Sequence, residues 1–164
     1  MRDYGAIAHA AAGLRDLPRD ERFRRFTDIA WERLAPTGVS WLGFYTPAPD
    51  EASLILGPCR DKPACSPLDL RGEHVGVCAR CWLERRALIV PDVATLGADY
   101  VACDPRDRSE VVVPLLDGAG RCTGVLDLDS HETGAFSEAD AAGLHRALLG
   151  AGLTAAAHAA ALGI

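Results

Sequence analysis

The chain has 164 residues, the usual size of one domain with a core of its own. Hydrophobic residues make up 49% of it and charged residues 24%, which is typical of a packed globular domain and excludes a disordered chain. The formal net charge of −6 argues against a non-specific grip on nucleic acid or on an anionic membrane surface.

The N-terminal part, residues 1–36, is predicted to form helices over 4–16 and 20–34. Apolar side chains recur at helical spacing in the second of these, and Asp20 is well placed to cap it. No apolar run precedes Arg15, so we expect no secretion signal and a cytoplasmic protein.

The rest of the chain alternates between strand and helix patterns. We expect a hairpin over 39–57, a loop over 58–74, a helix over 75–86, a strand over 88–90, an irregular stretch over 91–108, and a second hairpin over 109–129. This order predicts an α+β fold with a mainly antiparallel central sheet flanked by helices. One domain over 1–164 is expected, with the catalytic sheet and its loops in 39–130.

A final helix is predicted over 137–162. Ser137 is placed to cap it, with Glu138 and Asp140 in its first turn. The tail from Ala147 onward is apolar but consists mostly of alanine and glycine. A helix packed on the fold or on a second subunit is therefore expected, rather than a membrane span.

The strand Trp41-Leu42-Gly43-Phe44-Tyr45 has side chains of interest on one face. Because side chains alternate along a strand, Trp41, Gly43 and Tyr45 point the same way. The simpler interpretation is a strand buried on both faces. The pattern also fits an aromatic wall beside a ligand, with Gly43 leaving room between the two rings.

Three acids stand near the ends of predicted strands. Asp127 and Asp129 alternate with leucines, which puts both carboxylates on one face, although a solvent-facing strand would show the same pattern. Glu110 heads an almost wholly apolar run from 111 to 116, so we expect it near the end of a buried strand.

Six cysteines lie at 59, 65, 78, 81, 103 and 122. In a reducing compartment such cysteines are buried side chains, metal ligands or redox groups. Cys65 and Cys103 fall in predicted loops. Cys78 falls in the first turn of the helix predicted over 75–86, where amide donors and the helix dipole favour a thiolate.

Six short motifs occur in a specific order. They are W-x-G-F-Y at 41–45, K-P-A-C at 62–65, G-V-C at 76–78, A-C-D at 102–104, S-E at 109–110 followed by V-P-L, and G-V-L-D-x-D-S at 124–130. Together they resemble the free methionine-(R)-sulfoxide reductases, enzymes built on a GAF domain. The resemblance runs from about Trp41 to Phe136.

The resemblance implies a role for each of three cysteines. Cys103 matches the nucleophile, which would attack the sulfoxide sulfur and become a sulfenic acid. Cys65 matches the thiol that forms the first disulfide, and Cys78 a second recycling thiol, although these last two roles can be exchanged. A thioredoxin-like dithiol protein would restore the enzyme, so no bound cofactor and no metal are expected.

The same resemblance assigns a substrate pocket for a free amino acid. Glu110, Asp127 and Asp129 match its acids, of which at least one should hold a proton for the sulfoxide oxygen while others pair with the α-ammonium. Trp41 and Tyr45 would close over the methyl-sulfur end. The resemblance and the terminal helix together favour a homodimer.

Two other functions remain open on the sequence. A non-catalytic GAF module that binds or senses a ligand would keep the same pocket, and it would be expected to carry an output domain. A structural zinc site could use Cys59, Cys65, Cys78 and Cys81, although the five-residue gap between the first two is unusual. Two departures from the family pattern are Ala79, where glycine is common, and a longer segment between Cys65 and Cys78.

Overall fold

The computed structural model describes residues 2–61, 63–72 and 74–164. Within these residues, seven strands form one sheet in the order β3-β2-β1-β6-β5-β4-β7. The strands are β1 (Trp41–Pro47), β2 (Ser53–Arg60), β3 (Leu68–Asp69), β4 (Arg86–Val90), β5 (Ser109–Leu116), β6 (Cys122–Ser130) and β7 (Ala159–Gly163). Neighbouring strands are antiparallel, except that β4 and β7 run parallel. The predicted α+β class with a mainly antiparallel sheet is confirmed.

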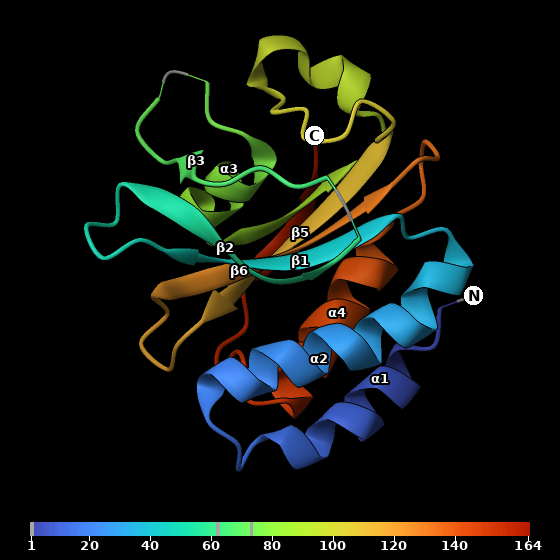
Figure 1. Cartoon of the computed structure of the whole chain (residues 1–164), viewed down its shortest axis with the longest axis vertical. Coiled ribbons are helices and arrows are strands. Elements are labelled where there is room, and N and C mark those ends of the chain that lie inside the picture. Colours follow the sequence, from blue (N-terminus) through green and yellow to red (C-terminus); the bar gives the residue numbers. More distant parts are fainter. Residues whose placement is uncertain (1, 62, 73) are drawn as a thin grey trace.

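The helices divide between the two faces of the sheet (Figure 1). Helices α1 (Tyr4–Ala11), α2 (Arg19–Leu34) and α4 (Glu138–Gly150) lie together on one face, and α3 (Val77–Glu84) lies on the other. The larger core cluster fills the space between the sheet and the three grouped helices. A smaller cluster packs under α3 and the loops beside it.

Strand β1 contributes to both clusters, as its alternating pattern predicts. Leu42 and Phe44 are fully buried in the larger cluster, where the Phe44 ring lies 4.6 Å from that of Phe23 in α2. Trp41 and Tyr45 belong to the smaller cluster on the α3 side. The face that carries the aromatic wall is therefore the face away from the grouped helices.

Two predicted element boundaries need correction. Strand β2 continues to Arg60, three residues past the predicted hairpin, because Cys59 and Arg60 still pair with β1. Helix α2 begins at Arg19 behind Pro18, so Asp20 is not its cap. Asp20 instead lies in the first turn, where a carboxylate interacts favourably with the helix dipole.

The C-terminal helix is much shorter than predicted. Ser137 caps it as expected, with a reciprocal hydrogen bond to Asp140, but the helix ends at Gly150 instead of continuing to 162. Gly152 adopts the left-handed conformation (φ 66°), which interrupts the helix at low cost because glycine has no Cβ. The last residues then form β7 along the free edge of β4. No helix of the described residues is long and apolar enough to cross a membrane.

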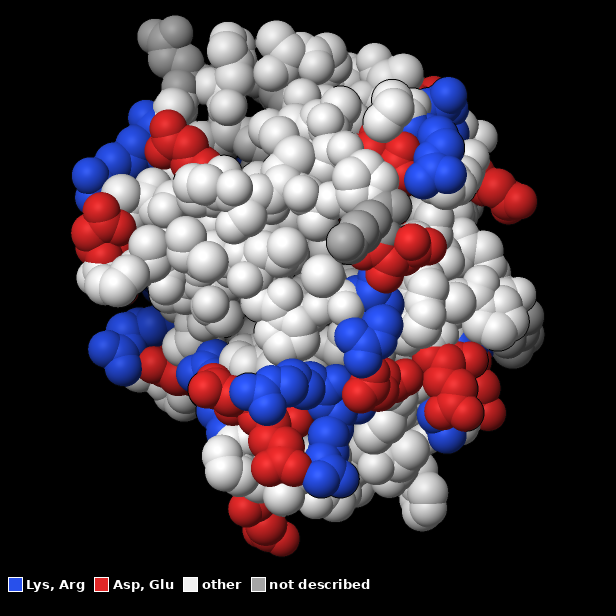
Figure 2. All heavy atoms as spheres, viewed as in Figure 1, with Lys and Arg blue, Asp and Glu red and all other residues white. Residues whose placement is uncertain are grey.

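Charged side chains on the helical side are balanced locally. Figure 2 shows arginines interleaved with acidic side chains in a band at the level of α2. Arg25 pairs with Glu21 one turn earlier at 2.7 Å, and Arg60 of β2 pairs with Asp28 of α2. Ion pairs within α2 and between α2 and β2 therefore neutralise part of the charge in this band.

Candidate active site

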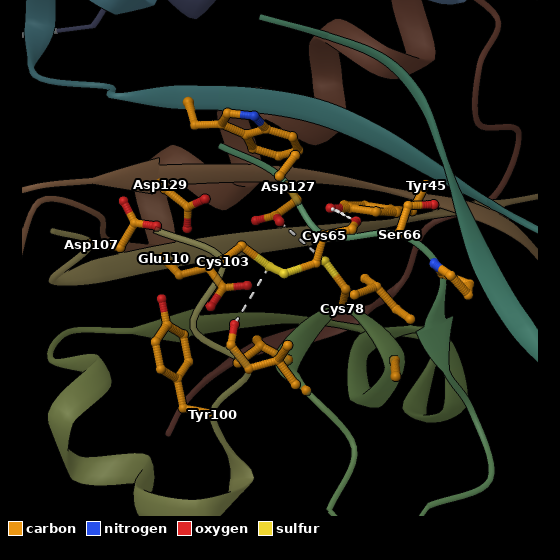
Figure 3. A pocket seen from close by; sticks show the side chains of 18 of the residues that line it. Tyr45, Cys65, Ser66, Cys78, Tyr100, Cys103, Asp107, Glu110, Asp127 and Asp129 are labelled. Atoms are coloured by element: carbon orange, nitrogen blue, oxygen red, sulfur yellow. Dashed lines mark hydrogen bonds between the residues drawn. A yellow bond between two sulfur atoms is a disulfide. The ribbon is translucent and has the colours of Figure 1, made fainter. Parts of the chain in front are cut away.

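A cavity of about 540 Å³ opens on the α3 side of the sheet. This size is typical of a site that takes a small molecule. Its walls come from β1, β5, β6, the start of α3 and the loops that follow β2 and β4 (Figure 3). All eight predicted site residues line it: Trp41, Tyr45, Cys65, Cys78, Cys103, Glu110, Asp127 and Asp129.

The aromatic wall is formed as the strand pattern predicts. The rings of Trp41 and Tyr45 lie 6.0 Å apart, and both side chains are buried. Gly43 makes room for the wall: a Cβ atom there would lie 2.3 Å from Trp41 Cη2 and 2.8 Å from Cys59 Cβ. Both interpretations of the strand hold, because it is buried on both faces and also lines the cavity.

Strand register brings the acids to the same wall. Asp129 of β6 pairs with Trp41 of β1 on one side and with Glu110 of β5 on the other. Asp127, two residues earlier, pairs with Gly43. Residues directly opposite in neighbouring strands point to the same face, so the acids share the face that carries the aromatic wall.

Burial raises the pKa values of several of these acids, so they keep their protons to a higher pH than exposed carboxyl groups do. It raises the pKa of Asp127 to about 7, an effect that the Cys78 hydrogen bond partly offsets. Burial and the nearby Asp127 charge raise the pKa values of Glu110 and Asp129 well above the ordinary range. Closely spaced buried carboxyl groups cannot all ionise cheaply, so the cavity holds exchangeable protons near neutral pH.

Cys65 and Cys103 form a disulfide in this structure, with their Cα atoms 5.3 Å apart. Both come from loops, and the bond joins the loop after β2 to the loop before β5. Tyr45 Oη donates a hydrogen bond of 2.9 Å to the Cys65 carbonyl oxygen, which ties the first loop to β1. The two cysteines that the resemblance pairs first are therefore in bonding distance within the cavity (Figure 3).

Cys78 sits deeper, and the prediction of a thiolate there is wrong. Its Sγ donates a hydrogen bond of 3.2 Å to Asp127 Oδ2. Burial, the Asp127 charge and the Glu110 charge together raise the pKa of the Cys78 thiol well above its usual range. The backbone amides at the start of the short helix α3 do not lower this pKa enough to compensate, because the thiol is buried next to carboxyl groups.

The remaining cysteines lie outside the lining of the cavity among the described residues. Cys81 is fully buried in the smaller cluster, and Cys59 and Cys122 are half-buried and pack against it. Cys65 is bonded to Cys103 and is not available to join the other cysteines around a zinc ion. Lys62, the first residue of the K-P-A-C motif that ends at Cys65, lies outside the described residues.

Among the residues that the structure describes, two groups of side chains place potential metal-ligand atoms within 4.8 Å of one another: Cys78 with Glu110 and Asp127, and Asp104 with Asp107 and His131. In each group at least one potential ligand atom already takes part in a hydrogen bond or an ion pair. In the first group a proton bridges Cys78 and Asp127, and in the second the Arg106 guanidinium holds Asp104 at 2.7 Å.

Asp107 and Tyr100 were missed by the sequence reasoning, although both line the cavity. Burial raises the pKa of Asp107 to about 6, with a further contribution from Asp104. Asp107 stands three residues before Glu110, at the end of a stretch without periodicity. Nothing in that stretch indicates which way a side chain points. The short distance in sequence between Asp107 and Glu110 was the one available indication that both could lie at the same site.

Comparison with known proteins agrees with this geometry. The sequence profile of the GAF domain matches residues 16–153. The chain is 37% identical to the free methionine-R-sulfoxide reductase of Saccharomyces cerevisiae over 112 residues, which is 68% of this chain and 59% of that protein. The structure of free methionine-R-sulfoxide reductase from Neisseria meningitidis in complex with its substrate is 30% identical, with a TM-score of 0.79, covering 91% of this chain and 86% of that one. The chain belongs to the free methionine-R-sulfoxide reductase family of GAF domains.

Another structure of the free methionine-R-sulfoxide reductase family, the reduced form from Staphylococcus aureus, is 28% identical with a TM-score of 0.80. It covers 92% of this chain and 94% of that one. Among the curated relatives, the matched segment spans about three fifths of the yeast protein's length. The resemblance that the six motifs carry is confirmed at the level of family and fold.

Proposed function

We propose that this protein reduces free L-methionine-(R)-sulfoxide to methionine through a thiol mechanism. The observation that carries the proposal is the cavity itself, where the Cys65–Cys103 disulfide, buried carboxyl groups and an aromatic wall meet in about 540 Å³. Relatives that carry this activity in their names support the same conclusion.

In the proposed first step, the thiolate of reduced Cys103 attacks the sulfoxide sulfur. The sulfoxide oxygen takes a proton from a cavity acid and passes to the Cys103 sulfur, while the bond formed between the two sulfurs breaks, so the products are methionine and a Cys103 sulfenic acid. Glu110 is our choice for the proton donor, since burial and the Asp127 charge raise its pKa well above the ordinary range. An acid that still holds its proton near neutral pH is suited to this role.

In the second step, Cys65 attacks the sulfenic acid sulfur of Cys103. Water leaves, and the Cys65–Cys103 disulfide forms. The bond present in the structure supports Cys65 over Cys78 as the first partner. An external dithiol, of the thioredoxin type, then reduces the disulfide back to two thiols, with no bound cofactor required.

Cys78 is proposed to act in this recycling. Its attack on the disulfide would need a thiolate, and Asp127 is already positioned to accept the thiol proton through the 3.2 Å hydrogen bond. Because burial raises the pKa of Asp127 to about 7, this carboxyl can both accept and release a proton near neutral pH.

The remaining groups of the cavity are proposed to recognise a free amino acid. Trp41 and Tyr45 pack against the methyl-sulfur end, where sulfur–aromatic contacts each contribute about 0.3–1.5 kcal/mol. Asp129 faces the ammonium group. Backbone amides at the start of α3 take the carboxylate, beside Gly76 and Val77 of the cavity lining. We further propose that the enzyme works as a homodimer in the reducing cytoplasm.

The test is incubation of the purified protein with each epimer of free methionine sulfoxide and a dithiol, followed by quantification of free methionine. Consumption of the R epimer alone is expected. Consumption of neither epimer would contradict the proposal and favour a ligand-binding or redox-sensing GAF module.

A further inference from the structure

Cys81 is a buried cysteine that none of the six motifs contains and that the proposed cycle does not use. It keeps a free thiol, and it is not among the described residues that line the cavity. It follows Cys78 by three residues, so the two cysteines form a C-x-x-C sequence. Cysteines at this spacing exchange disulfides in redox proteins, which makes Cys78 the first reaction partner to consider for Cys81.

Helix α3 brings the two cysteines close together. Cα atoms three residues apart in an α-helix are separated by about 5 Å, and a disulfide needs about 4.4–6.8 Å. Cys78 and Cys81 are both buried in the smaller cluster, so they lie on the same buried face of α3. A disulfide between them requires the Cβ atoms to approach from about 5–6 Å to about 3.5–4.5 Å. The first turn can make this adjustment because no side-chain cap holds the helix at Gly76.

The structure places this reduced dithiol beside an oxidised one. Burial contributes most to the raised pKa of Cys78, and a charge on Cys81 adds to it. Both cysteines are free thiols while Cys65 and Cys103 are bonded. Because Cys78 lines the cavity that contains the disulfide, it connects Cys81 to the reacting cysteines.

We propose that Cys81 is the resolving thiol for Cys78, so that the C-x-x-C pair takes over the disulfide of the cavity and leaves Cys103 ready for a second turnover. The inference rests on the proposed function and adds a fourth reacting cysteine to it. Four thiols of one chain then serve two turnovers before an external dithiol is needed.

The exchange conserves electrons and protons. Cys78 gives its thiol proton to Asp127 and attacks one sulfur of the Cys65–Cys103 disulfide; that bond breaks, a mixed disulfide with Cys78 forms, and the other sulfur leaves as a thiolate. Cys81 then attacks the Cys78 sulfur, so the mixed disulfide breaks and the Cys78–Cys81 bond forms. The two released cavity thiolates take up the protons of Cys78 and Cys81. One dithiol is oxidised, and the other is restored.

The second substrate molecule drives this exchange. The structure has the bond at Cys65–Cys103 and free thiols at Cys78 and Cys81, so the resting equilibrium favours the cavity disulfide. One equivalent of sulfoxide should therefore leave the bond there. An excess of sulfoxide consumes each Cys103 thiolate that the exchange releases, and this draws the disulfide onto the C-x-x-C pair.

The test uses fully reduced protein, without dithiol, and an excess of L-methionine-(R)-sulfoxide. Wild type should release two methionines per chain. Trypsin, which cuts after arginine, should then yield peptides 72–80 and 81–85 joined by a disulfide.

The variant Cys81→Ala should lose only the second disulfide. It should release the first methionine within about twofold of the wild-type rate, which also shows that the variant folds, because Cys65 and Cys103 are intact. Any second methionine should leave Cys103 as a sulfenic acid that dimedone traps, since no thiol remains in the cavity to condense with it.

Two further variants are controls. Cys122→Ser removes a half-buried thiol that contributes to the raised pKa of Cys81, and it should keep both equivalents of methionine. Cys103→Ser removes the nucleophile and should give no joined peptides, because oxidation of the C-x-x-C pair passes through Cys103.

Release of one methionine by wild type, with Cys78 and Cys81 still open to alkylation, would overturn the inference. A Cys81–Cys122 disulfide or joined peptides in Cys103→Ser would do the same. If wild type releases no methionine, the proposed reductase function fails instead, and two equivalents of hydrogen peroxide then oxidise Cys103 in place of the sulfoxide, with water as the product. Joined peptides in wild type but not in Cys103→Ser support the role of Cys81, and their absence in wild type overturns it.

Discussion

Cys78 Sγ donates its proton to Asp127 Oδ2 across 3.2 Å, within the same cavity that contains the Cys65–Cys103 disulfide. This contact links the proposed recycling thiol to a carboxyl whose pKa burial raises to about 7. A proton can therefore pass between thiol and carboxyl without leaving the cavity. The reactivity of Cys78 should depend on Asp127 more than on any helix dipole.

The first prediction concerns the variant Asp127→Asn. Because the Asp127 charge helps to raise the pKa of the Cys78 thiol, its removal should lower that pKa and speed alkylation of Cys78 by iodoacetamide about three- to tenfold at pH 8. Mass spectrometry of tryptic peptides measures the rate. Cys81 is an internal control, since Arg80 places the two cysteines in different peptides.

Cys81 is as deeply buried as Cys78. Among the neighbouring groups that raise the pKa of Cys81, however, Cys122 has a larger effect than Asp127. Its alkylation should change less than that of Cys78 in Asp127→Asn. Equal acceleration of both peptides would point to general loosening of α3 and would contradict the account.

The second prediction concerns stability against pH in the oxidised protein. Burial raises the pKa of Asp127 to about 7, above its value near 4 in an unfolded chain. The folded state thus holds this proton more tightly than the unfolded chain does. The contribution of protonated Asp127 to the free energy of unfolding is therefore fully present below about pH 4 and is lost as the pH rises through about 7. The other cavity acids with raised pKa act in the same direction.

Asp127→Asn should remove part of this dependence. We expect the free energy of unfolding to fall less between about pH 4.5 and 7.5 in the variant than in wild type, by on the order of 3 kcal/mol. Urea unfolding at both pH values measures it. Identical slopes for the two proteins would show that Asp127 ionises normally in the folded state.

The third prediction concerns the glycine beneath the aromatic wall. Gly43→Ala would bring a Cβ within 2.3 Å of Trp41 Cη2, so the indole must move. We expect a loss of about 1–3 kcal/mol in stability, the usual cost of overpacking, and a higher KM for the sulfoxide. Gly118→Ala is the matched control, because nothing lies within 4 Å of its added Cβ. Similar losses in both variants would contradict the packing argument.

The fourth prediction separates the two disulfide partners. Cys65→Ser should still release one equivalent of methionine, because Cys103 remains, but turnover with a dithiol should fall at least tenfold as the sulfenic acid loses its first partner. Cys122→Ser, at a half-buried site in the hairpin, should keep turnover within about twofold. Unchanged turnover in Cys65→Ser would assign the first disulfide to Cys78 instead.

Much of this site was predictable because strand alternation determines side-chain direction. Trp41 and Tyr45, and separately Asp127 and Asp129, were each placed on one face from a period of two. The register between β1 and β6 places these two pairs side by side. The sequence predicted this only through the family resemblance, because local patterns do not specify which strands are neighbours. Ser137 was recognisable as a helix cap because serine is a favoured residue at that position, which is also a local property of the sequence.

The errors have physical causes that a local pattern does not contain. The alanine-rich tail has high helix propensity, yet Gly152 and the free edge of β4 turn its last residues into a strand. Cys78 was expected to ionise from its place in α3, but its pKa depends on burial and on Asp127 in another strand. Asp107 was missed because its loop lacks any period.

The most direct test is a single turnover of the reduced protein with one equivalent of L-methionine-(R)-sulfoxide, without added dithiol. The account predicts one methionine per chain and a Cys65–Cys103 disulfide in the peptide map, and no methionine from Cys103→Ser. Methionine released by Cys103→Ser, or a reduced Cys103 after turnover of wild type, would contradict it.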